Sequence, residues 1–285
     1  MERADRAGGK PPSLREQPHS RANAAPMAAA SCGVAVMAKA SAPGRAKTRL
    51  VPPLTFDAAA ALNTAFLKDV AANILLAARR ARTGAAIAGY AAYGPPESET
   101  FFDETFAGAI GLIPAWLPNF GDCLMHAIRE IFARGHASAV VLNADSPNLP
   151  TALLNETAEI LARPGDRAVL GPSSDGGYYL LGLKAAHERM FQDIAWSTER
   201  VAEQTRARAS EIGLDVDVLP LWYDVDDVED LRLLHAQLCR DNGAPSGDRL
   251  RPHQAHYSKA LLQSLWPDGE FGRIQRRAPT APAHV

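Results

Sequence analysis

The sequence lacks paired cysteines. Cys32, Cys123 and Cys239 lie far apart and form no CxxC motif, which excludes a disulfide scaffold and fits a reducing compartment. Long apolar runs are also lacking: no uncharged apolar stretch reaches the roughly 18 residues that a membrane span needs. Charge of one sign is not in excess, since a net charge of −2 gives no global reason to bind nucleic acid or an anionic membrane. These absences predict a cytoplasmic protein with neither a nucleic-acid nor a membrane partner, and they leave its oligomeric state open.

The composition is that of a globular protein. Of the 285 residues, 47% are apolar and 22% are charged, which allows one large domain or two small ones. Residues 1–30 hold four prolines and no periodic apolar pattern, so they predict a disordered tail. Residues 241–285 are expected to be mostly irregular, with one amphipathic piece, Ser258–Trp266, that either docks on the core or stays mobile. The working domain is therefore expected over residues 31–240.

The N-terminal segment leaves an alternative open. Basic residues precede an alanine-rich run from Ala22 to Ala38, and Cys32 could mimic a lipoprotein cysteine. The run is interrupted by Pro26 and lacks a leucine-rich centre, which argues against an export signal. Met27 could equally be the natural first residue.

The middle of the chain alternates between short apolar runs and helical patterns. The expected strands are Cys32–Met37, Ala85–Ala91, Ala109–Ile113, Ala139–Leu142, Ala168–Leu170, Tyr178–Leu183 and Val216–Leu219. The expected helices are Ala58–Arg80, Cys123–Ala133, Ala152–Ala162, Glu199–Ile212 and Val228–Arg240. This order predicts an α/β fold: a Rossmann-like three-layer αβα sandwich with a mainly parallel sheet. Ligands of such sheets bind beyond the carboxyl ends of the strands, so polar residues just after strands are the candidates for function.

A basic, glycine-containing loop follows the first strand. It carries Lys39, Gly44, Arg45, Lys47 and Arg49. Backbone N–H groups can approach a phosphate closely at a glycine, and four cations stand nearby, so the loop favours anion binding. It is not a Walker A loop, because alanine stands where that motif needs glycine before the lysine. The alternative is a solvated basic loop.

Asp145 directly follows the apolar strand at Ala139–Leu142. A carboxylate there could hold a divalent cation that bridges two phosphates. An Asx-turn is an equal alternative, because Asp-Ser-Pro is good turn chemistry.

Asp175 begins a second polar segment, in which Gly176, Gly177 and Tyr178 follow it between two apolar runs. Asp-Gly in this setting predicts a β-hairpin turn, and from the residues alone the turn is favoured. The projecting Asp175 could also recognise a sugar or serve as a base.

Asp224 and Asp226 form an i, i+2 pair at a strand end and so face the same side. They could complete a metal site with Asp145. Alternatively, Asp226 caps the following helix, with Glu229 three residues later as support. Both functions are possible if Asp226 binds the metal and Asp227 caps the helix.

Taken in order, these segments resemble a bacterial family. The matching motifs are Met37–Ala40, Pro43–Leu50, Ala65–Leu67 with Asp69, Asp145–Pro147, Leu170–Pro172, Asp175–Tyr179, Gly182–Leu183, Trp196–Thr198, Gln204–Thr205, Tyr223–Asp226 and Glu229–Leu231. They resemble the small glycosyltransferase-like family of the GT-A nucleotide-diphospho-sugar transferase superfamily that is named for arsenosugar biosynthesis. The match covers about residues 33–235.

The resemblance implies a GT-A fold that binds a nucleotide and a divalent cation, Mg²⁺ or Mn²⁺. By motif position, Asp145 and Asp226 would hold the metal, and Lys47 and Asp175 would be catalytic. The residues implied on the nucleotide and phosphate side are Lys39, Gly44, Arg45, Arg49 and Asp122. Those implied on the substrate side are Gly176, Gly177, Tyr178 and Trp196.

One segment departs from the family pattern. Gly121 and Asp122 remain, but Cys123, Leu124 and His126 stand where the family has leucine, glycine and arginine. In the superfamily this region lines the pocket of the nucleotide base, so the departure affects which base is expected.

The expected function is glycosyl transfer from a nucleotide-sugar to a small-molecule acceptor. The alternative is nucleotidyl transfer, such as guanylyl transfer, from a nucleoside triphosphate to a phosphorylated small molecule with release of pyrophosphate, because one fold hosts both reactions. A third hypothesis is a non-catalytic nucleotide-binding protein, which the altered segment at residues 121–126 suggests.

Overall fold

The computed structural model describes residues 31–81, 85–239 and 250–266. The predicted tail at residues 1–30 and most of the one at 241–285 lie outside the described residues. The strands are β1 Ser31–Lys39, β2 Ala86–Gly94, β3 Gly111–Pro114, β4 Ser138–Leu142, β5 Ala168–Pro172, β6 Tyr178–Leu183 and β7 Val216–Val218. The helices are α1 Phe56–Arg80, α2 Glu99–Phe106, α3 Phe120–Ala133, α4 Thr151–Leu161, α5 Val201–Glu211, α6 Val228–Cys239 and α7 His256–Leu265. Three short 3₁₀ helices, η1 Thr48–Leu50, η2 Pro96–Ser98 and η3 Glu188–Phe191, lie in the connections.

The strands form one seven-stranded sheet in the order β3-β2-β1-β4-β6-β5-β7. Strand β6 runs antiparallel to β4 and β5, and the other pairings between the described strands are parallel. The predicted mainly parallel sheet is therefore confirmed. The predicted hairpin is confirmed too, because β5 and β6 are antiparallel neighbours joined by the turn at residues 173–177.

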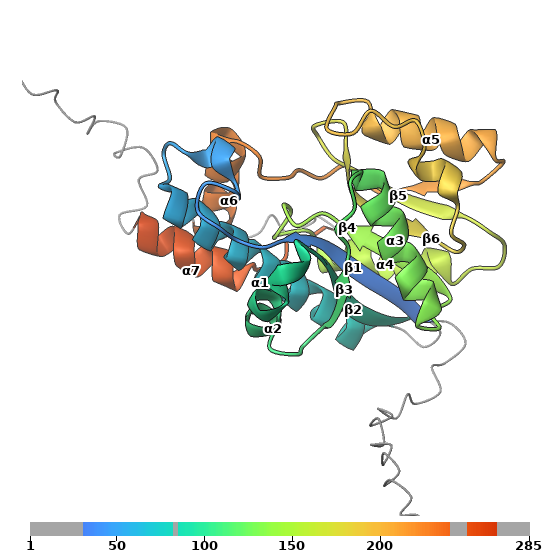
Figure 1. Ribbon diagram of the computed structural model, residues 1–285, viewed down its shortest axis with the longest axis horizontal. Coiled ribbons are helices and arrows are strands. Elements are labelled where there is room, and N and C mark those ends of the chain that lie inside the picture. Colours follow the sequence, from blue (N-terminus) through green and yellow to red (C-terminus); the bar gives the residue numbers. More distant parts are fainter. Residues whose placement is uncertain (1–30, 82–84, 240–249, 267–285) are drawn as a thin grey trace, which may run out of the picture.

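Helices cover both faces of the sheet (Figure 1). One core cluster joins β1 to α1, α2 and α4 through side chains such as Val34, Leu67 and Leu153. A second cluster joins the opposite face to α3 and α5, with Ala35 and Ile128 among its members. Adjacent strand residues point to opposite faces, so Val34 and Ala35 enter different clusters. Because both faces are covered, the central strands β1, β4 and β6 are mostly apolar.

Helix α1 is long enough and apolar enough, by length and composition alone, to cross a membrane. It has 25 residues, and 67% of its most apolar 18-residue stretch is buried inside the fold. Burial of this extent is typical of the core helix of a globular domain.

A third cluster lies beside the sheet and joins η1, the first half of α1, α6 and α7. Its members include Leu50, Phe66, Val225 and Leu262. Figure 1 shows α6 and α7 grouped at this end of the molecule. The amphipathic piece near the C-terminus thus docks on the core as α7, one of the two arrangements that the sequence allowed.

Asp69 of α1 fixes the start of α7. Its carboxylate accepts hydrogen bonds from the backbone N–H groups of Tyr257 (3.0 Å) and Ser258 (2.7 Å) and from the Ser258 hydroxyl (2.5 Å). The first N–H groups of a helix have no partner within the helix, so a carboxylate from another element can cap them. Asp69, one of the family-motif positions, therefore anchors α7.

All seven expected strands and all five expected helices form, with ends shifted by a few residues. Helix α2 was not expected. It has eight residues, and only Phe102 and Phe106 among them are buried, so its apolar period is too short to stand out.

Candidate functional site

The carboxyl ends of β1, β2, β3 and β4 meet at one edge of the sheet, because these strands are parallel and adjacent. Lys39 pairs with Gly94, Tyr93 pairs with Pro114, and Val36 pairs with Leu142. The connections that follow the four strands therefore emerge at the same edge, where α/β sheets bind ligands. The basic loop after β1 and the Asp145 segment after β4 are two of them.

The basic loop is held to the core by two apolar side chains, and its charged side is exposed to solvent. Ala46 and Leu50 are buried, whereas Gly44, Arg45 and Arg49 are exposed. Gly44 has a φ of +75° and open space where a side chain would stand, which leaves its backbone accessible. Lys39 is exposed as well, so the predicted phosphate loop has three of its four cations in solvent.

Lys47 is the inward member of the basic loop. Its backbone adopts the left-handed conformation (φ 49°), and only 7% of its side chain is exposed. Its ammonium lies 2.9 Å from Asp145 Oδ1 and 3.5 Å from Asp226 Oδ1, and it also donates to the Val225 carbonyl. It stands 5.4 Å from the Phe66 ring centroid. The two predicted metal ligands therefore converge on one lysine.

The segments that carry these two aspartates are bonded to each other. The Val225 N–H donates to the Asp145 carbonyl (2.9 Å), and the Ser146 hydroxyl donates to the Tyr223 carbonyl (2.9 Å). These bonds hold residues 145 and 226 side by side although they are far apart in the sequence. The alternative of a simple Asx-turn does not account for this pairing.

Asp175 lies in the β5–β6 turn. One of its carboxylate oxygens accepts the Gly177 N–H at 2.8 Å, and the Ser173 N–H donates to the Gly177 carbonyl. Gly176 has a φ of +88°, and a Cβ there would stand 2.0 Å from the Glu199 carbonyl oxygen. The turn therefore requires glycine at 176, which leaves Asp175 as the side chain that projects.

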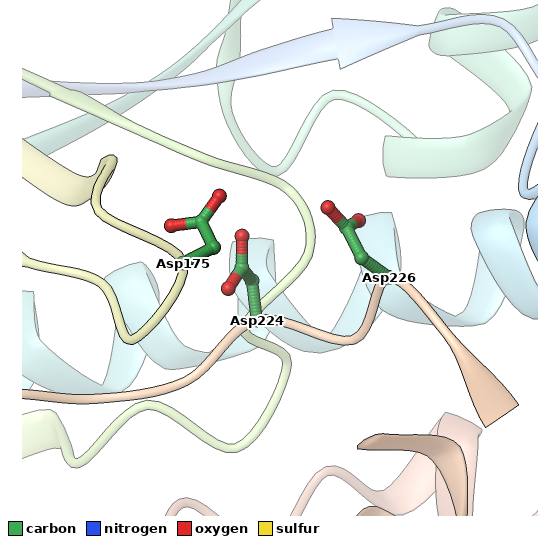
Figure 2. Close-up of side chains that lie close together, drawn as sticks. All are labelled: Asp175, Asp224 and Asp226. Atoms are coloured by element: carbon green, nitrogen blue, oxygen red, sulfur yellow. The ribbon is translucent and has the colours of Figure 1, made fainter. Parts of the chain in front are cut away.

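Asp175, Asp224 and Asp226 form a group of three carboxylates. One oxygen of each lies within 4.8 Å of the others. Figure 2 shows Asp224 and Asp226 on one segment, with their carboxylates on the same side, and Asp175 reaching them from a separate loop. Asp175 is exposed, and the other two are partly buried.

Asp224 is the most strongly perturbed of the three. Burial, with the negative charges of Asp175 and Asp226, raises the pKa of its carboxyl to about 6 against the lowering effect of the Ser173 hydroxyl bond. That hydroxyl donates to Asp224 Oδ1 at 2.6 Å. A carboxylate held among like charges is stabilised by a cation, and three oxygen ligands suit a hard divalent one. The residues present therefore fit Mg²⁺ or Mn²⁺.

The predicted pair of metal ligands and the observed group share only Asp226. The group does not include Asp145, whose carboxylate forms a salt bridge with Lys47 at 2.9 Å. The i, i+2 spacing had offered Asp224 together with Asp226 as a metal ligand, whereas the motif resemblance implied only Asp145 and Asp226. The roles assigned to Asp145 and Asp226 remain predictions.

The cap of α6 is Asp227, not Asp226. Asp227 Oδ1 accepts the N–H groups of Glu229 (2.8 Å) and Asp230 (3.0 Å), and Asp230 Oδ2 accepts those of Asp226 and Asp227 (both 3.1 Å). This is a reciprocal cap: the Asp227 carboxylate accepts from the first turn of the helix, and the Asp230 carboxylate accepts from the residues that precede it. The interpretation of Asp226 as the capping residue is therefore wrong, and the alternative in which Asp227 caps the helix is confirmed.

The segment that departs from the family pattern is bound to its own loop. The Cys123 thiol accepts the Leu117 N–H (3.2 Å) and donates to the Leu117 carbonyl (3.6 Å). His126 Nε2 bonds the Pro114 carbonyl at 3.0 Å. Asp122 accepts a bond from the Asn119 amide (3.0 Å) in the first turn of α3. The structure thus ties these side chains to the β3–α3 connection, and the nucleotide role of Asp122 stays a prediction.

The remaining substrate-side residues lie on two elements. Trp196 meets Phe120 edge to face, with ring centroids 5.3 Å apart, and a Cβ on Gly121 would stand 3.0 Å from its indole. Tyr178 begins β6 directly after the Asp175 turn, and its buried hydroxyl has no hydrogen-bond partner within the described part of the chain. Trp196 is therefore set against the start of α3, and Tyr178 packs against the core cluster on the same face of the sheet.

The fold is of the GT-A and nucleotidyltransferase type: a mixed, mainly parallel seven-stranded sheet between helices. A candidate nucleotide-diphospho-sugar transferase from Desulfovibrio desulfuricans G20 has a similar structure. It is 26% identical, covers 82% of this chain and 97% of its own, and superposes with a TM-score of 0.65. Residues 77–198 match a family model described as an uncharacterized protein conserved in bacteria, DUF2064.

Two other solved structures are more distant. A CTP complex of CMP:2-keto-3-deoxy-manno-octonic acid synthetase is 11% identical, with 73% of this chain and 99% of that chain covered and a TM-score of 0.46. A cytidylyltransferase from Leptospira borgpetersenii serovar Hardjo-bovis is 9% identical, with 88% and 99% covered and a TM-score of 0.48. No curated protein sequence matches the chain.

Proposed function

We propose that the protein is a metal-dependent glycosyltransferase that moves a sugar from a nucleotide-sugar to a small-molecule acceptor. The observation that carries this proposal is the meeting of three carboxylates with Lys47 and Arg49 at the carboxyl edge of the sheet. An anionic cluster beside cations is what a metal-bound diphosphate needs. The likeness to the Desulfovibrio structure supports a nucleotide-diphospho-sugar transferase. The motif resemblance alone supports the arsenosugar-biosynthesis type.

The carboxylates and the cations of the site would bind different parts of the substrate complex. Asp224 and Asp226 would hold the divalent cation, with Asp145 as a further predicted ligand, and Lys47, Arg45 and Arg49 would bind the diphosphate. A bound Mg²⁺ or Mn²⁺ supplies charge that stabilises the leaving nucleoside diphosphate. The cationic side chains add to that stabilisation as the bond between the sugar and the phosphate oxygen breaks.

Asp175 is proposed as the acceptor-side carboxylate. One of its oxygens accepts the Gly177 N–H, so the other is available to an acceptor hydroxyl. That oxygen would take the hydroxyl proton as the acceptor oxygen forms its bond to the anomeric carbon. Gly176, Gly177, Tyr178 and Trp196 would shape the substrate side.

The test is calorimetric titration with nucleoside diphosphates and nucleotide-sugars, with and without Mn²⁺, followed by product analysis. We expect binding that depends on Mn²⁺, then transfer of the sugar with release of a nucleoside diphosphate. Absence of metal-dependent nucleotide binding would refute the proposal. Release of pyrophosphate from a nucleoside triphosphate would instead establish nucleotidyl transfer.

A further inference from the structure

Lys47 occupies the position of a counter-ion in this structure. Its ammonium lies 2.9 Å from Asp145 Oδ1 and 3.5 Å from Asp226 Oδ1, and a third bond runs to the Val225 carbonyl. An ammonium group has three donors, and these three oxygens use all of them. In this state Lys47 has no donor left for a phosphate.

We propose that Lys47 couples diphosphate binding to metal binding by exchanging partners. Without a ligand, its ammonium neutralises Asp145 and Asp226. When a diphosphate binds, Lys47 leaves these carboxylates for a phosphate oxygen, and Asp226 becomes fully available to the cation. This inference rests on the proposed function, because it assigns the order in which the same site is filled.

The charge around Asp226 supports this exchange. A divalent cation held by Asp226 and Asp224 has to share Asp226 with an ammonium 3.5 Å from it, which lowers the affinity for the metal alone. A diphosphate removes this repulsion by giving the ammonium another anion to bind. The effect is reciprocal, since two ligands that shift the same equilibrium raise each other's affinity by the same factor.

The surroundings of Lys47 favour a side chain with two positions. Its ammonium stands over the Phe66 ring, 5.4 Å from the ring centroid, and meets carboxylates whose side chains are 35% and 40% exposed, so a phosphate in solvent can reach this end of the side chain. Arg49 provides an internal comparison. It reaches Asp226 at 3.8 Å, but 79% of its side chain is exposed, so solvent screens its charge.

The experiment measures Mn²⁺ affinity by calorimetry for the wild type, for Lys47→Met and for the control Lys184→Met, whose ammonium donates to the Arg163 carbonyl outside the proposed site. Each protein is titrated alone and with inorganic pyrophosphate, and free concentrations are corrected for the complex that the two ligands form in solution. We expect Lys47→Met to bind Mn²⁺ alone more tightly than the wild type, by about fivefold or more. With pyrophosphate present the order reverses, and the variant binds Mn²⁺ more weakly. Lys184→Met should change the affinity for Mn²⁺ in either state by less than about twofold.

Other outcomes separate the alternatives. If Lys47→Met leaves the affinity for Mn²⁺ alone unchanged and weakens only the pyrophosphate state, Lys47 is a phosphate ligand without a counter-ion role, and the inference is wrong. If both states weaken together, Lys47 has a structural role, and the inference is wrong again.

The wild type provides a test that does not depend on the folding of a variant. Equal Mn²⁺ affinity with and without pyrophosphate overturns the coupling while leaving the proposed metal-dependent function intact. No Mn²⁺ binding in either state refutes the proposed function itself.

Discussion

Two clusters of carboxylates in this protein differ in whether cations accompany them. In the first, Arg189 bonds Asp193 and Glu211, both at 2.6 Å, and Arg208 also bonds Glu211. The arginine lowers the pKa of both carboxyls. In the second cluster, the carboxylates of the Asp175, Asp224 and Asp226 group lie within 4.8 Å of one another, and burial raises the pKa of Asp224 to about 6.

The difference separates a surface ion-pair network from a binding site. The first cluster already contains its cations, and both of its carboxylates are exposed, so it needs no ligand. The second holds like charges together, with Lys47 and the exposed Arg49 reaching only Asp226 among the three. Like charges brought together at a cost in the folded state are common where a cation binds.

The largest expected effect comes from removing one charge of the second cluster. Asp226→Asn or Asp224→Asn should weaken Mn²⁺ binding by more than the roughly 100-fold that loss of an outer-shell partner costs, because a direct ligand is lost. Calorimetric titration with Mn²⁺ measures this. Asp193→Asn, in the first cluster, serves as the control and should bind Mn²⁺ as the wild type does.

Substitutions in the two clusters should affect Mn²⁺ binding differently. Wild-type Mn²⁺ affinity in Asp224→Asn would show that the three carboxylates are not a metal site. A circular-dichroism melt of each variant checks that the fold is retained, since the cap of α6 belongs to Asp227 and should be unaffected.

Asp69 is a buried carboxylate that is stabilised by hydrogen-bond donors rather than by a cation. Asp69→Ala would leave the N–H groups of Tyr257 and Ser258 and the Ser258 hydroxyl without their acceptor. We expect the free energy of unfolding to fall by about 3 kcal/mol, as for the loss of hydrogen bonds to a buried charged group. Urea unfolding measures it, and the exposed Glu104→Ala on α2 is the matched control. A loss as small as that of the control would mean that α7 docks without this cap.

His253 is a buried base whose protonation makes the stability of the fold depend on pH. Burial, together with the positive charges of His256 and Arg80, lowers the pKa of its imidazole to about 4. The unfolded chain takes up a proton near pH 6.5, whereas the folded protein does not, so the stability is fully present above about pH 6.5 and decreases as the pH falls toward 4. Between pH 7 and 5 the contribution of this group amounts to about 2 kcal/mol.

Urea unfolding of the wild type and of His253→Gln at both pH values isolates this contribution from that of the other histidines. The variant should lose about 2 kcal/mol less than the wild type on acidification. Equal losses in the two proteins would show that His253 is protonated in the folded state.

The smallest effect is expected in the surface network. Asp193→Ala removes one partner of Arg189, but 71% of the Asp193 side chain is exposed, and Glu211 remains bonded to the same arginine. The melting temperature should change by less than about 3 °C, and by even less at high salt. A large shift would mean that the two clusters differ less than their surroundings indicate.

Much of the fold could be predicted because local patterns carry it. Buried strands such as Ala139–Leu142 are continuous apolar runs, and Gly176 occupies a turn position that only glycine fits well. The direction of β6 also followed from its turn. Helix α2 could not be predicted, because two buried phenylalanines give too short a period.

The sequence by itself determined the layers of this fold, the hairpin and the loops that carry charge, since hydrophobic period and turn chemistry act over a few residues. The tertiary structure alone decided which charges meet. It joined Asp224 and Asp226 to Asp175, placed Lys47 between Asp145 and Asp226, and assigned the helix cap to Asp227. These pairings depend on which loops emerge at the same edge of the sheet and on ångström-scale distances, and neither is written in the spacing of residues along the chain.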